Sequence, residues 1–396
     1  MGLKAIVKKN RAVYRLANAV RKLPYPLIRA YMAACHALRG VDGKKVYFSS
    51  FSGKLYNENP KYVCEALHEI APDAKIVFRL NAQGMRQTDV PAYVHKVQQY
   101  SPRALYHMAT ARAVVKNASL APYMRTWPDQ KYIQLWHGDR GLKKICLDME
   151  NADPKRFTDR FYMNLGVCGS DFGRDIYMRR AFGYTGELLE CGYPKNDLLI
   201  RNPPEVCAAV RRELNIDPDA CVLLYAPTFR QRETGSAARA GFSLSALRDA
   251  LEAKTGQKWV MLTRGHTLNT GVRSDGDLDA SAYPDVSRLL LITDMLITDY
   301  SSIAGDYLLL NRPIILYHAD RCAYESDDRS LLFDPEASPY RVAHNPQELT
   351  EIACNFGDAA QNCRELAEFY GVRETGRASQ IVAARIAEWI GEKKNG

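Results

Sequence analysis

The chain lacks any apolar run that could cross a membrane, because none approaches the roughly 18–20 residues that a bilayer requires. Its 10 cysteines include no C-x-x-C pair, and none of its 8 histidines lies four positions from another. A zinc site and a disulfide framework are therefore unsupported, and a reducing compartment is favoured. Its hydrophobic fraction of 46% and charged fraction of 25% are those of an ordinary globular protein.

Acidic residues are absent from the first 40 positions, whereas the chain as a whole has 54 basic and 45 acidic residues. The net charge of +9 therefore resides in this segment, and the rest of the chain is neutral. At helical periodicity Ile6, Val13, Leu16 and Val20 share one face, and most of the cations lie opposite. We expect residues 1–40 to form a basic amphipathic helical arm on the anionic, cytoplasmic face of the cell membrane.

Two other interpretations of this arm stay open. It could be a solvated first helix packed on the body, or it could bind nucleic acid. The neutral body offers no second basic patch, so nucleic acid is not the expected partner. The segment also has no small-residue cleavage site and carries cations throughout, so secretion is not expected.

Strand, turn and helix signals alternate along the rest of the chain, a pattern typical of parallel sheets covered on both faces. The stretch RNPPEV (201–206) is the clearest linker signal, because paired prolines interrupt regular structure. The sequence thus predicts an α/β protein with two doubly wound, Rossmann-like domains facing a cleft. We place an N-terminal acceptor-side domain at 41–203 and a donor-binding domain with closing C-terminal helices at 204–396.

Polar side chains recur where the predicted strands end. In doubly wound sheets, ligands bind beyond the carboxyl ends of the strands, so these side chains should converge on an anionic ligand of nucleotide size. Two serines between a strand at 295–298 and a helix predicted over 303–310 could bind phosphate, although serine is also the usual helix cap. The strand-end residues are His137, Thr228, Arg230, Arg264, His266, Ser301 and Ser302.

Five motifs resemble, in order and spacing, the CDP-glycerol glycerophosphotransferase family of teichoic acid synthesis. They are SFSGKLYNENPKYVCEAL, QLWHGDRGLKKI, GYPKNDLL, LLYAPTFR and LITDYSSIAGDYLLLNRPIILY, and the similarity covers residues 44–335. The resemblance implies a glycosyltransferase-B fold at the inner membrane surface. It also implies transfer of a polyol phosphate from CDP-glycerol or CDP-ribitol to a hydroxyl of a lipid-linked acceptor, with release of CMP.

The resemblance implies catalytic roles for His137 and His266. We expect His137 to be the general base, because an imidazole near neutral pKa can take the proton of the acceptor hydroxyl. His266 would bind the donor diphosphate or protonate the departing phosphate. The alternatives are a structural hydrogen bond for a strand-end histidine and an ordinary first-turn acid at Asp306. The expected substrate-binding residues are Gly138, Gly141, Lys195, Pro227, Thr228, Arg230, Arg264, Ser301, Ser302 and Asp306.

Three departures from the family pattern bear on these expectations. The family usually has His-Gly-x-Pro-Leu-Lys, whereas this chain has one extra residue and no proline at Asp139–Gly141. Lys195 replaces an arginine, which keeps the charge but loses the bidentate fork. Thr267 stands where a proline usually follows the second histidine.

No cofactor or metal is expected, since Asp294 and Asp299 flank one strand and point to opposite faces. Two other functions stay open: a nucleotide-sugar transferase of the same architecture, and a non-catalytic membrane-bound nucleotide-binding protein. The sequence leaves the donor polyol, the acceptor lipid and the oligomeric state undecided. Its compact length favours a primase or a short-chain or capsule-type transferase.

Overall fold

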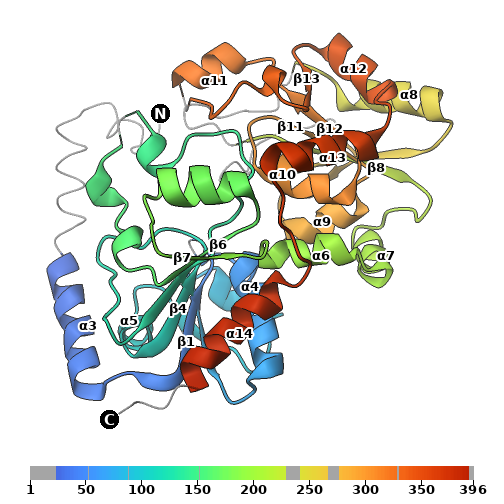
Figure 1. The fold of residues 1–396 in the computed structure, drawn as a ribbon. Helices are drawn as coiled ribbons and strands as arrows, with labels where there is room; N and C mark the ends of the chain where they lie inside the picture. Colours follow the sequence, from blue (N-terminus) through green and yellow to red (C-terminus); the bar gives the residue numbers. More distant parts are fainter. Residues whose placement is uncertain are drawn as a thin grey trace.

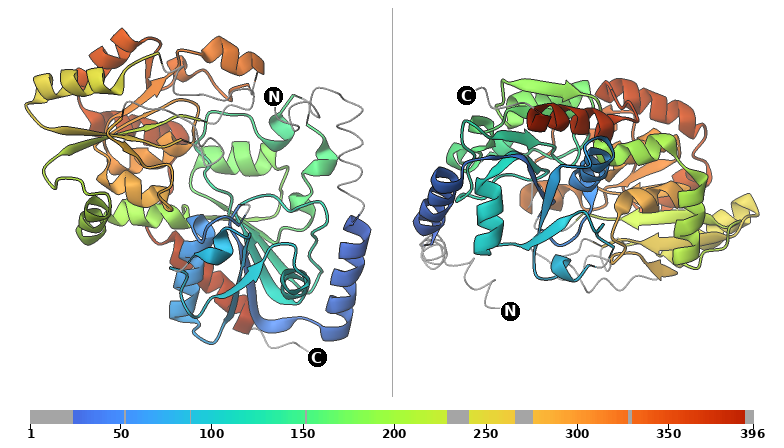
Figure 2. Two further views of the ribbon diagram at one scale, coloured as in Figure 1. Left: turned by 180° about the vertical axis from the view of Figure 1, so that it is seen from behind. Right: turned by 90° about the horizontal axis from the view of Figure 1, so that it is seen from below.

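The computed structural model describes residues 24–51, 53–87, 89–150, 152–228, 241–265, 276–327 and 330–391. These residues form two parallel sheets, each with its own helices, which lie side by side as two lobes (Figures 1 and 2). The amphipathic pattern of the predicted arm, Arg230 and His266 lie outside the described residues.

The first sheet has seven strands in the order β3-β2-β1-β4-β5-β6-β7, and every described pair in it is parallel. The strands are short and mostly buried, which suits a sheet covered on both faces. They are β1 (Asp42–Ser49), β2 (Lys75–Leu80), β3 (His95–Gln98), β4 (Ala111–Lys116), β5 (Lys131–Gln134), β6 (Leu165–Cys168) and β7 (Glu187–Glu190).

Alternate residues of these strands feed two separate cores. Val46 and Phe48 of β1 pack with α4 (Glu58–Ile70) and α14 (Ala378–Gly391) on one face. Tyr47 points to the opposite core, which includes residues of α3 (Tyr25–Arg39) and α5 (Pro102–Ala109). The period of two along the strand thus places helices on both faces of the sheet.

The second sheet is also wholly parallel in its described pairs, in the order β10-β9-β8-β11-β12-β13. One face packs on α7 (Pro204–Glu213), α9 (Val286–Ile292), α10 (Ile303–Tyr307) and α13 (Ala359–Tyr370). The other packs on α8 (Leu244–Thr255) and α12 (Pro346–Cys354). The strands are β8 (Cys221–Ala226), β9 (Trp259–Thr263), β10 (Leu278–Asp279), β11 (Met295–Thr298), β12 (Ile314–Tyr317) and β13 (Arg341–Ala343).

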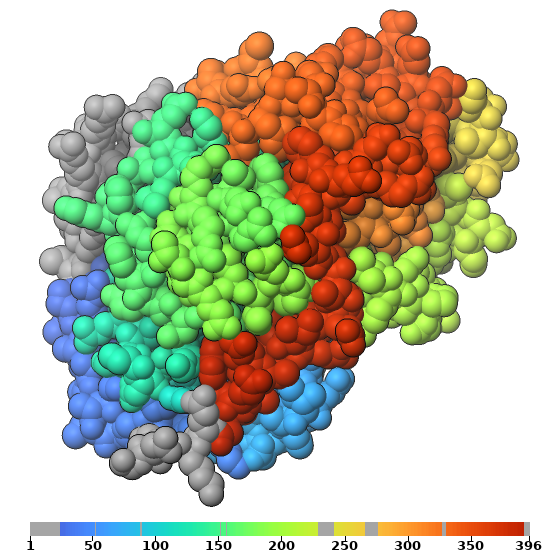
Figure 3. All heavy atoms as spheres, viewed as in Figure 1, coloured from blue at the N-terminus to red at the C-terminus, as the bar shows by residue number. Residues whose placement is uncertain are grey.

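The C-terminal helix α14 does not stay with the second sheet. It packs on α4 and against β1 and β4 of the first sheet. Figure 3 shows this red segment crossing the surface from the second lobe to the first. The predicted range 204–396 therefore includes one helix that belongs to the first core, while the boundary at 203/204 stays a prediction.

Other differences are local. The stretch predicted as a linker contains the start of α7 at Pro204, a position where proline is well tolerated because the first helical N–H needs no partner. The helix predicted over 303–310 consists of α10 followed by a short 3-10 turn at Leu308–Leu310. Among the described residues, no helix combines the length and apolarity that a membrane span needs.

Candidate active site

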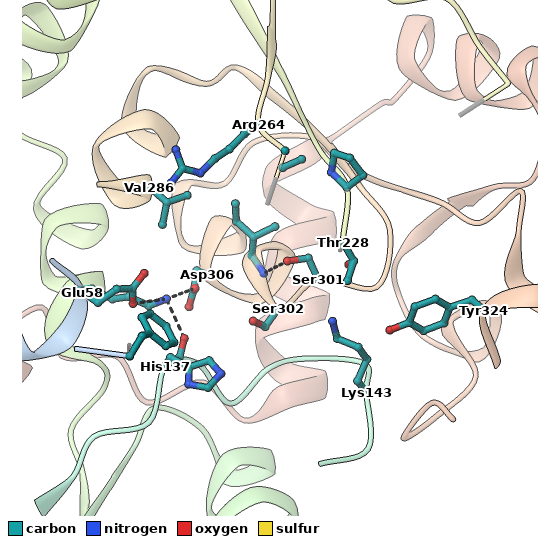
Figure 4. Close-up of a pocket in the computed structure, with 16 residues that line it drawn as sticks. Glu58, His137, Lys143, Thr228, Arg264, Val286, Ser301, Ser302, Asp306 and Tyr324 are labelled. Carbon is teal, nitrogen blue, oxygen red and sulfur yellow. Dashed lines mark hydrogen bonds and ion pairs between the residues drawn. The ribbon is translucent and has the colours of Figure 1, made fainter. Parts of the chain in front are cut away.

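A cavity of about 470 Å³ lies where the two sheets face each other (Figure 4). Its size lies within the range of small-ligand sites. The first-sheet side supplies Phe51, Glu58, His137, Lys143 and Lys195. The second-sheet side follows the ends of β8, β9 and β11 and the start of α9, and includes one residue of α11 (Arg321–Asp327). Its members are Ala226, Pro227, Thr228, Arg264, Gly265, Val286, Ser301, Ser302, Ile303, Asp306 and Tyr324.

His137 is partly buried and lies in the segment that follows β5. Its Nδ1 lies 3.0 Å from the carbonyl oxygen of Asn117. A carbonyl only accepts, so Nδ1 carries the proton and Nε2 is the nitrogen able to accept one. Burial lowers the pKa of His137 to about 4, so the imidazole is neutral near pH 7. It has the protonation state that a general base requires.

Phe51 is held against this histidine in a constrained conformation. Its φ is +39°, a region that side chains with a Cβ rarely adopt. Its N–H donates to Asn117 Oδ1 at 2.8 Å, and its carbonyl accepts from Arg79 Nη2 at 3.0 Å. The phenyl ring lies 5.1 Å from the imidazole, measured between centroids. Asn117 therefore fixes both the tautomer of His137 and the residue packed beside it.

Lys195 is buried, and its amine contacts three protein groups. Its amine donates to the carbonyl of His137 at 3.0 Å and to Asp306 Oδ2 at 2.8 Å, and lies 3.5 Å from Glu58 Oε2. Burial opposes the charge, but the carboxylates of Asp306 and Glu58 outweigh it and raise the pKa of the amine. Two hydrogen bonds and one ion pair therefore surround the ammonium group. The geometry thus supports an anchoring role for Lys195, and its substrate-binding role stays a prediction.

Arg140 lies in the segment that departs from the family pattern, and it connects the loop that follows His137 to the second lobe. Only 1% of its surface is exposed. Its Nε donates to the carbonyl of Gly305 at 2.6 Å, and its Nη1 donates to that of Gly169 at 3.2 Å. Nη2 pairs with Glu374 Oε1 at 2.8 Å and lies 3.4 Å from Asp306 Oδ1. One guanidinium therefore joins the residue that follows β6, the helix α10 and the segment before α14.

The buried ionic network has more acids than bases. Asp139 accepts the N–H of Gly169 at 2.7 Å, and Glu374 accepts the N–H of Tyr193 at 2.9 Å. Burial raises the pKa of Asp139, Glu374 and Glu58, in each case against the attraction of a nearby cation. The four acids are Glu58, Asp139, Asp306 and Glu374, and the two cations are Arg140 and Lys195.

The backbone of the loop that follows His137 approaches the paired serines closely. A Cβ at Gly141 would lie 2.7 Å from the hydroxyl of Tyr177 and 3.2 Å from Cβ of Ser302. Gly138 has a φ of +142°, and a Cβ there would lie 3.5 Å from Ser302 Oγ. Gly141 requires glycine for this close packing, whereas Gly138 favours glycine because of its positive φ. The structure thus brings Gly138, Gly141 and Ser302 together.

On the second-sheet side, Thr228 and Arg264 are partly occupied by protein partners. The hydroxyl of Thr228 donates to Asp299 Oδ1, which also accepts the N–H of Thr228 at 2.8 Å. Nη1 of Arg264 donates to the carbonyls of Ala280 and Tyr283 at 2.9 and 2.8 Å. The rest of the guanidinium faces the cavity (Figure 4). The expected donation from the Thr228 hydroxyl to a diphosphate stays a prediction.

A second cavity of about 350 Å³ adjoins the first and shares His137, Lys143 and Ser302 with it. Its other described members come from the loops around β5 and from two aromatic residues further along the chain. They are Ser119, Trp136, Gly138, Gly141, Ile145, Cys146, Met149, Phe157 and Tyr177.

Strained backbone marks both cavities. Apart from asparagines, which adopt positive φ readily, five described non-glycine residues have positive φ, and four of them line a cavity. Such strain persists where the surroundings impose it, and it concentrates at functional sites. The four are Phe51, Glu58, Trp136 and Cys146.

Sequence reasoning missed several residues of the site. Lys143 could have been found, since it is the lysine that ends the His-Gly motif. Glu58 and Phe51 carry no periodic signal, and Glu374 lies far along the chain from every motif. In the described part of the chain, no group of three or more His, Cys, Asp or Glu side chains could hold a metal ion.

Two doubly wound parallel sheets that share a cavity define a protein of the glycosyltransferase-B type, as predicted. The profile of the CDP-Glycerol:Poly(glycerophosphate) glycerophosphotransferase family matches residues 30–388. The chain belongs to this family, which confirms the resemblance drawn from the five motifs.

Individual relatives agree with this assignment. The chain is 30% identical over 376 residues to the teichoic acid poly(glycerol phosphate) polymerase of Staphylococcus epidermidis, covering 89% of this chain and 52% of that protein. It is 31% identical over 365 residues to the teichoic acid glycerol-phosphate transferase of Staphylococcus aureus, covering 86% and 92%. This chain spans about half the length of the first of these relatives.

A solved structure of the wall teichoic acid polymerase TagF, in a histidine-to-alanine variant, superimposes with a TM-score of 0.80 at 27% identity. The match covers 98% of this chain and 99% of that chain. Another solved TagF structure is a histidine-to-asparagine variant soaked with CDPG.

Proposed function

We propose that this protein transfers glycerol phosphate from CDP-glycerol to a hydroxyl of a lipid-linked acceptor in teichoic acid synthesis, and releases CMP. One observation carries the proposal: a neutral imidazole with Nδ1 fixed by a carbonyl lies in a cavity between two parallel sheets. Family membership and the CDPG soak of TagF support the choice of donor.

The acceptor hydroxyl would lie against Nε2 of His137, which takes its proton. The acceptor oxygen then bonds to the phosphorus of the glycerol phosphate group. The bond between that phosphorus and the oxygen that joins it to CMP breaks, and CMP leaves with the electron pair. An in-line transfer of this kind depends on positioning and on balancing the phosphate charge.

Cations and donors from both sides would balance that charge. Figure 4 shows the Lys143 amine and the Arg264 guanidinium directed into the cavity from opposite sheets. Ser301 and Ser302 follow β11 between them, and Ser302 makes no capping hydrogen bond through its side chain. These groups would bind phosphate oxygens, while His266 and Arg230 stay expected donor-binding residues.

The membrane location is part of the same proposal. A lipid-linked acceptor requires an enzyme at the membrane surface, and the basic segment at 1–40 would hold it peripherally on the cytoplasmic side. CDP-ribitol is a second candidate donor, because the chain is 26% identical over 339 residues to a teichoic acid poly(ribitol-phosphate) polymerase.

The direct test compares CDP-glycerol, CDP-ribitol and UDP-sugars as donors, with CMP or UDP release as the readout. We expect CDP-glycerol to be used and His137→Ala to reduce kcat about 10²–10⁴-fold, the usual cost of losing a general base. The matched control is His344→Ala, an exposed histidine paired with Glu336, which should leave kcat unchanged.

Circular dichroism would verify that both variants fold. Turnover with a UDP-sugar alone would replace the proposal with a glycosyltransferase. Binding of CDP-glycerol without turnover would replace it with a nucleotide-binding protein.

A further inference from the structure

The second cavity lies on the first-sheet side of the imidazole and is separate from most of the charged groups of the first. His137, Lys143 and Ser302 line both cavities, so the imidazole stands at their junction. A transfer between two substrates needs the acceptor hydroxyl at the base while the donor phosphorus lies within reach. Two adjoining cavities at one imidazole meet that requirement.

We propose that the second cavity is the acceptor site, and that it binds the polyol end of the acceptor with a single phosphodiester near Lys143. The inference rests on the proposed function for the identity of the reaction. It assigns the first cavity to the nucleotide donor and the second to the acceptor that the reaction lengthens.

The chemistry of the lining selects this kind of ligand. No acidic side chain lines the second cavity among the described residues, and Lys143 is its one charged member. Aromatic and apolar side chains form much of the rest, including Trp136, Met149 and Phe157. A monoanionic phosphodiester matches one cation. A nucleoside diphosphate, with at least two negative charges, is better matched by the first cavity, which Arg264 lines in addition to the shared Lys143.

The wall nearest the base is rigidly held. Trp136 has a φ of +52°, its N–H donates to Gln134 Oε1 at 3.0 Å, and its carbonyl accepts from Asn59 Nδ2 at 2.9 Å. Its ring lies 4.0 Å from the imidazole and packs edge-on against Phe182 at 4.8 Å, between centroids. The indole is therefore pre-positioned as a surface against which a polyol can lie beside His137.

Met149 offers the means to test the assignment, because it lines the cavity and 37% of its surface is exposed. A carboxylate at this position should be tolerated by the fold and should repel a phosphodiester. The probe is glycerophosphoglycerol, a soluble molecule with one phosphodiester and terminal hydroxyls, used as acceptor with CDP-glycerol.

For Met149→Glu we expect the KM for glycerophosphoglycerol to rise about tenfold, as like-charge juxtaposition in a binding site does. The KM for CDP-glycerol should stay unchanged. Met149→Gln, of the same shape without the charge, should show a much smaller rise. Arg264→Gln should give the reverse pattern, with a raised KM for CDP-glycerol alone. A rise in the CDP-glycerol KM for Met149→Glu, or no change in either KM, overturns the inference.

A binding measurement separates this result from the fate of the proposed function. Saturation-transfer NMR with glycerophosphoglycerol should detect binding to the wild-type protein that weakens in Met149→Glu but not in Met149→Gln. Charge-dependent binding without CMP release would sustain the acceptor site and refute the transferase reaction. No detectable binding together with unchanged KM values would refute the acceptor site and leave the reaction intact.

Discussion

The first-sheet side of the first cavity differs from the second-sheet side in how its side chains are held. On the first-sheet side, residues with positive φ and a buried ionic network fix Phe51, Glu58 and His137. On the second-sheet side, Thr228 follows β8 and bonds to Asp299, which follows the neighbouring strand β11, while Ser301 accepts the N–H of Ile303. The comparison indicates that the base is positioned by strained backbone and buried charges, whereas the proposed phosphate-binding groups need only the ordinary geometry of a sheet edge.

The largest effect is expected where the network of the first-sheet side is broken. Arg140→Met leaves the buried carboxylates of Asp139 and Glu374 without their cation, which should cost about 3–5 kcal/mol of unfolding free energy. Urea denaturation followed by circular dichroism measures this loss. Arg248→Ala, which removes an exposed pair with Asp277, is the control and should leave the midpoint unchanged. A similar midpoint for both variants would show that the network does not stabilise the fold.

Lys195 tests whether that network positions the base or binds the donor. In Lys195→Met the carbonyl of His137 loses its donor, so kcat should fall about 10²-fold, as expected for a displaced catalytic group. The KM for CDP-glycerol should change little. The exposed Lys258→Met provides the control. A raised KM for CDP-glycerol with kcat preserved would instead establish the substrate-binding role predicted from the sequence.

A smaller effect is expected from the second-sheet side. Ser302→Ala removes one hydroxyl that makes no capping hydrogen bond, so the midpoint of unfolding should not shift. Loss of a single hydrogen bond to a charged phosphate should lower kcat/KM for CDP-glycerol about tenfold. The control is Ser326→Ala, an exposed serine whose hydroxyl donates to the carbonyl of Ala323. An equal effect of both changes on kcat/KM would remove Ser302 from the site.

A change of pH near neutrality should affect kcat/KM less than any of these substitutions. Because burial lowers the pKa of His137 to about 4, the imidazole stays neutral as the pH falls from 8 toward 5. Any acid limb that His137 contributes to kcat/KM should therefore lie near pH 4, well below the value of about 6.5 for an exposed histidine. Between these two pKa values the unfolded chain binds more protons, so stability should decrease as the pH falls through this window. An acid limb near 6.5 that disappears in His137→Asn would show that the imidazole is more exposed in the working enzyme.

The second-sheet side was the part that sequence could predict. Its side chains follow buried apolar runs such as that of β11, and the carboxyl ends of parallel strands meet at one edge of a sheet. Thr228, Arg264 and Ser301 are therefore expected to lie close together, and they line one cavity. The short strands β10 and β13 were not predicted, because two or three residues carry no periodic signal.

The first-sheet side could be predicted only in part. His137 was found from its strand end and motif, but Glu58 reaches the cavity through a positive φ that its sequence context does not reveal. Arg140 was recognised as part of an irregular insertion, yet its partner Glu374 lies 234 positions further along the chain, the difference between the two residue numbers. No local pattern encodes a pairing over such a separation.

Because α14 packs on the first sheet, the C-terminal part of the chain helps to position His137, the proposed general base. Glu374 sits just before that helix, so the segment that grips Arg140 is held in place by packing on α4 and β1. Cutting the chain shortly after α13 would remove none of the described residues that line either cavity, yet it would take away a carboxylate that secures the loop behind His137. Fusions and deletions at the C-terminal end deserve the same caution as changes inside the pocket.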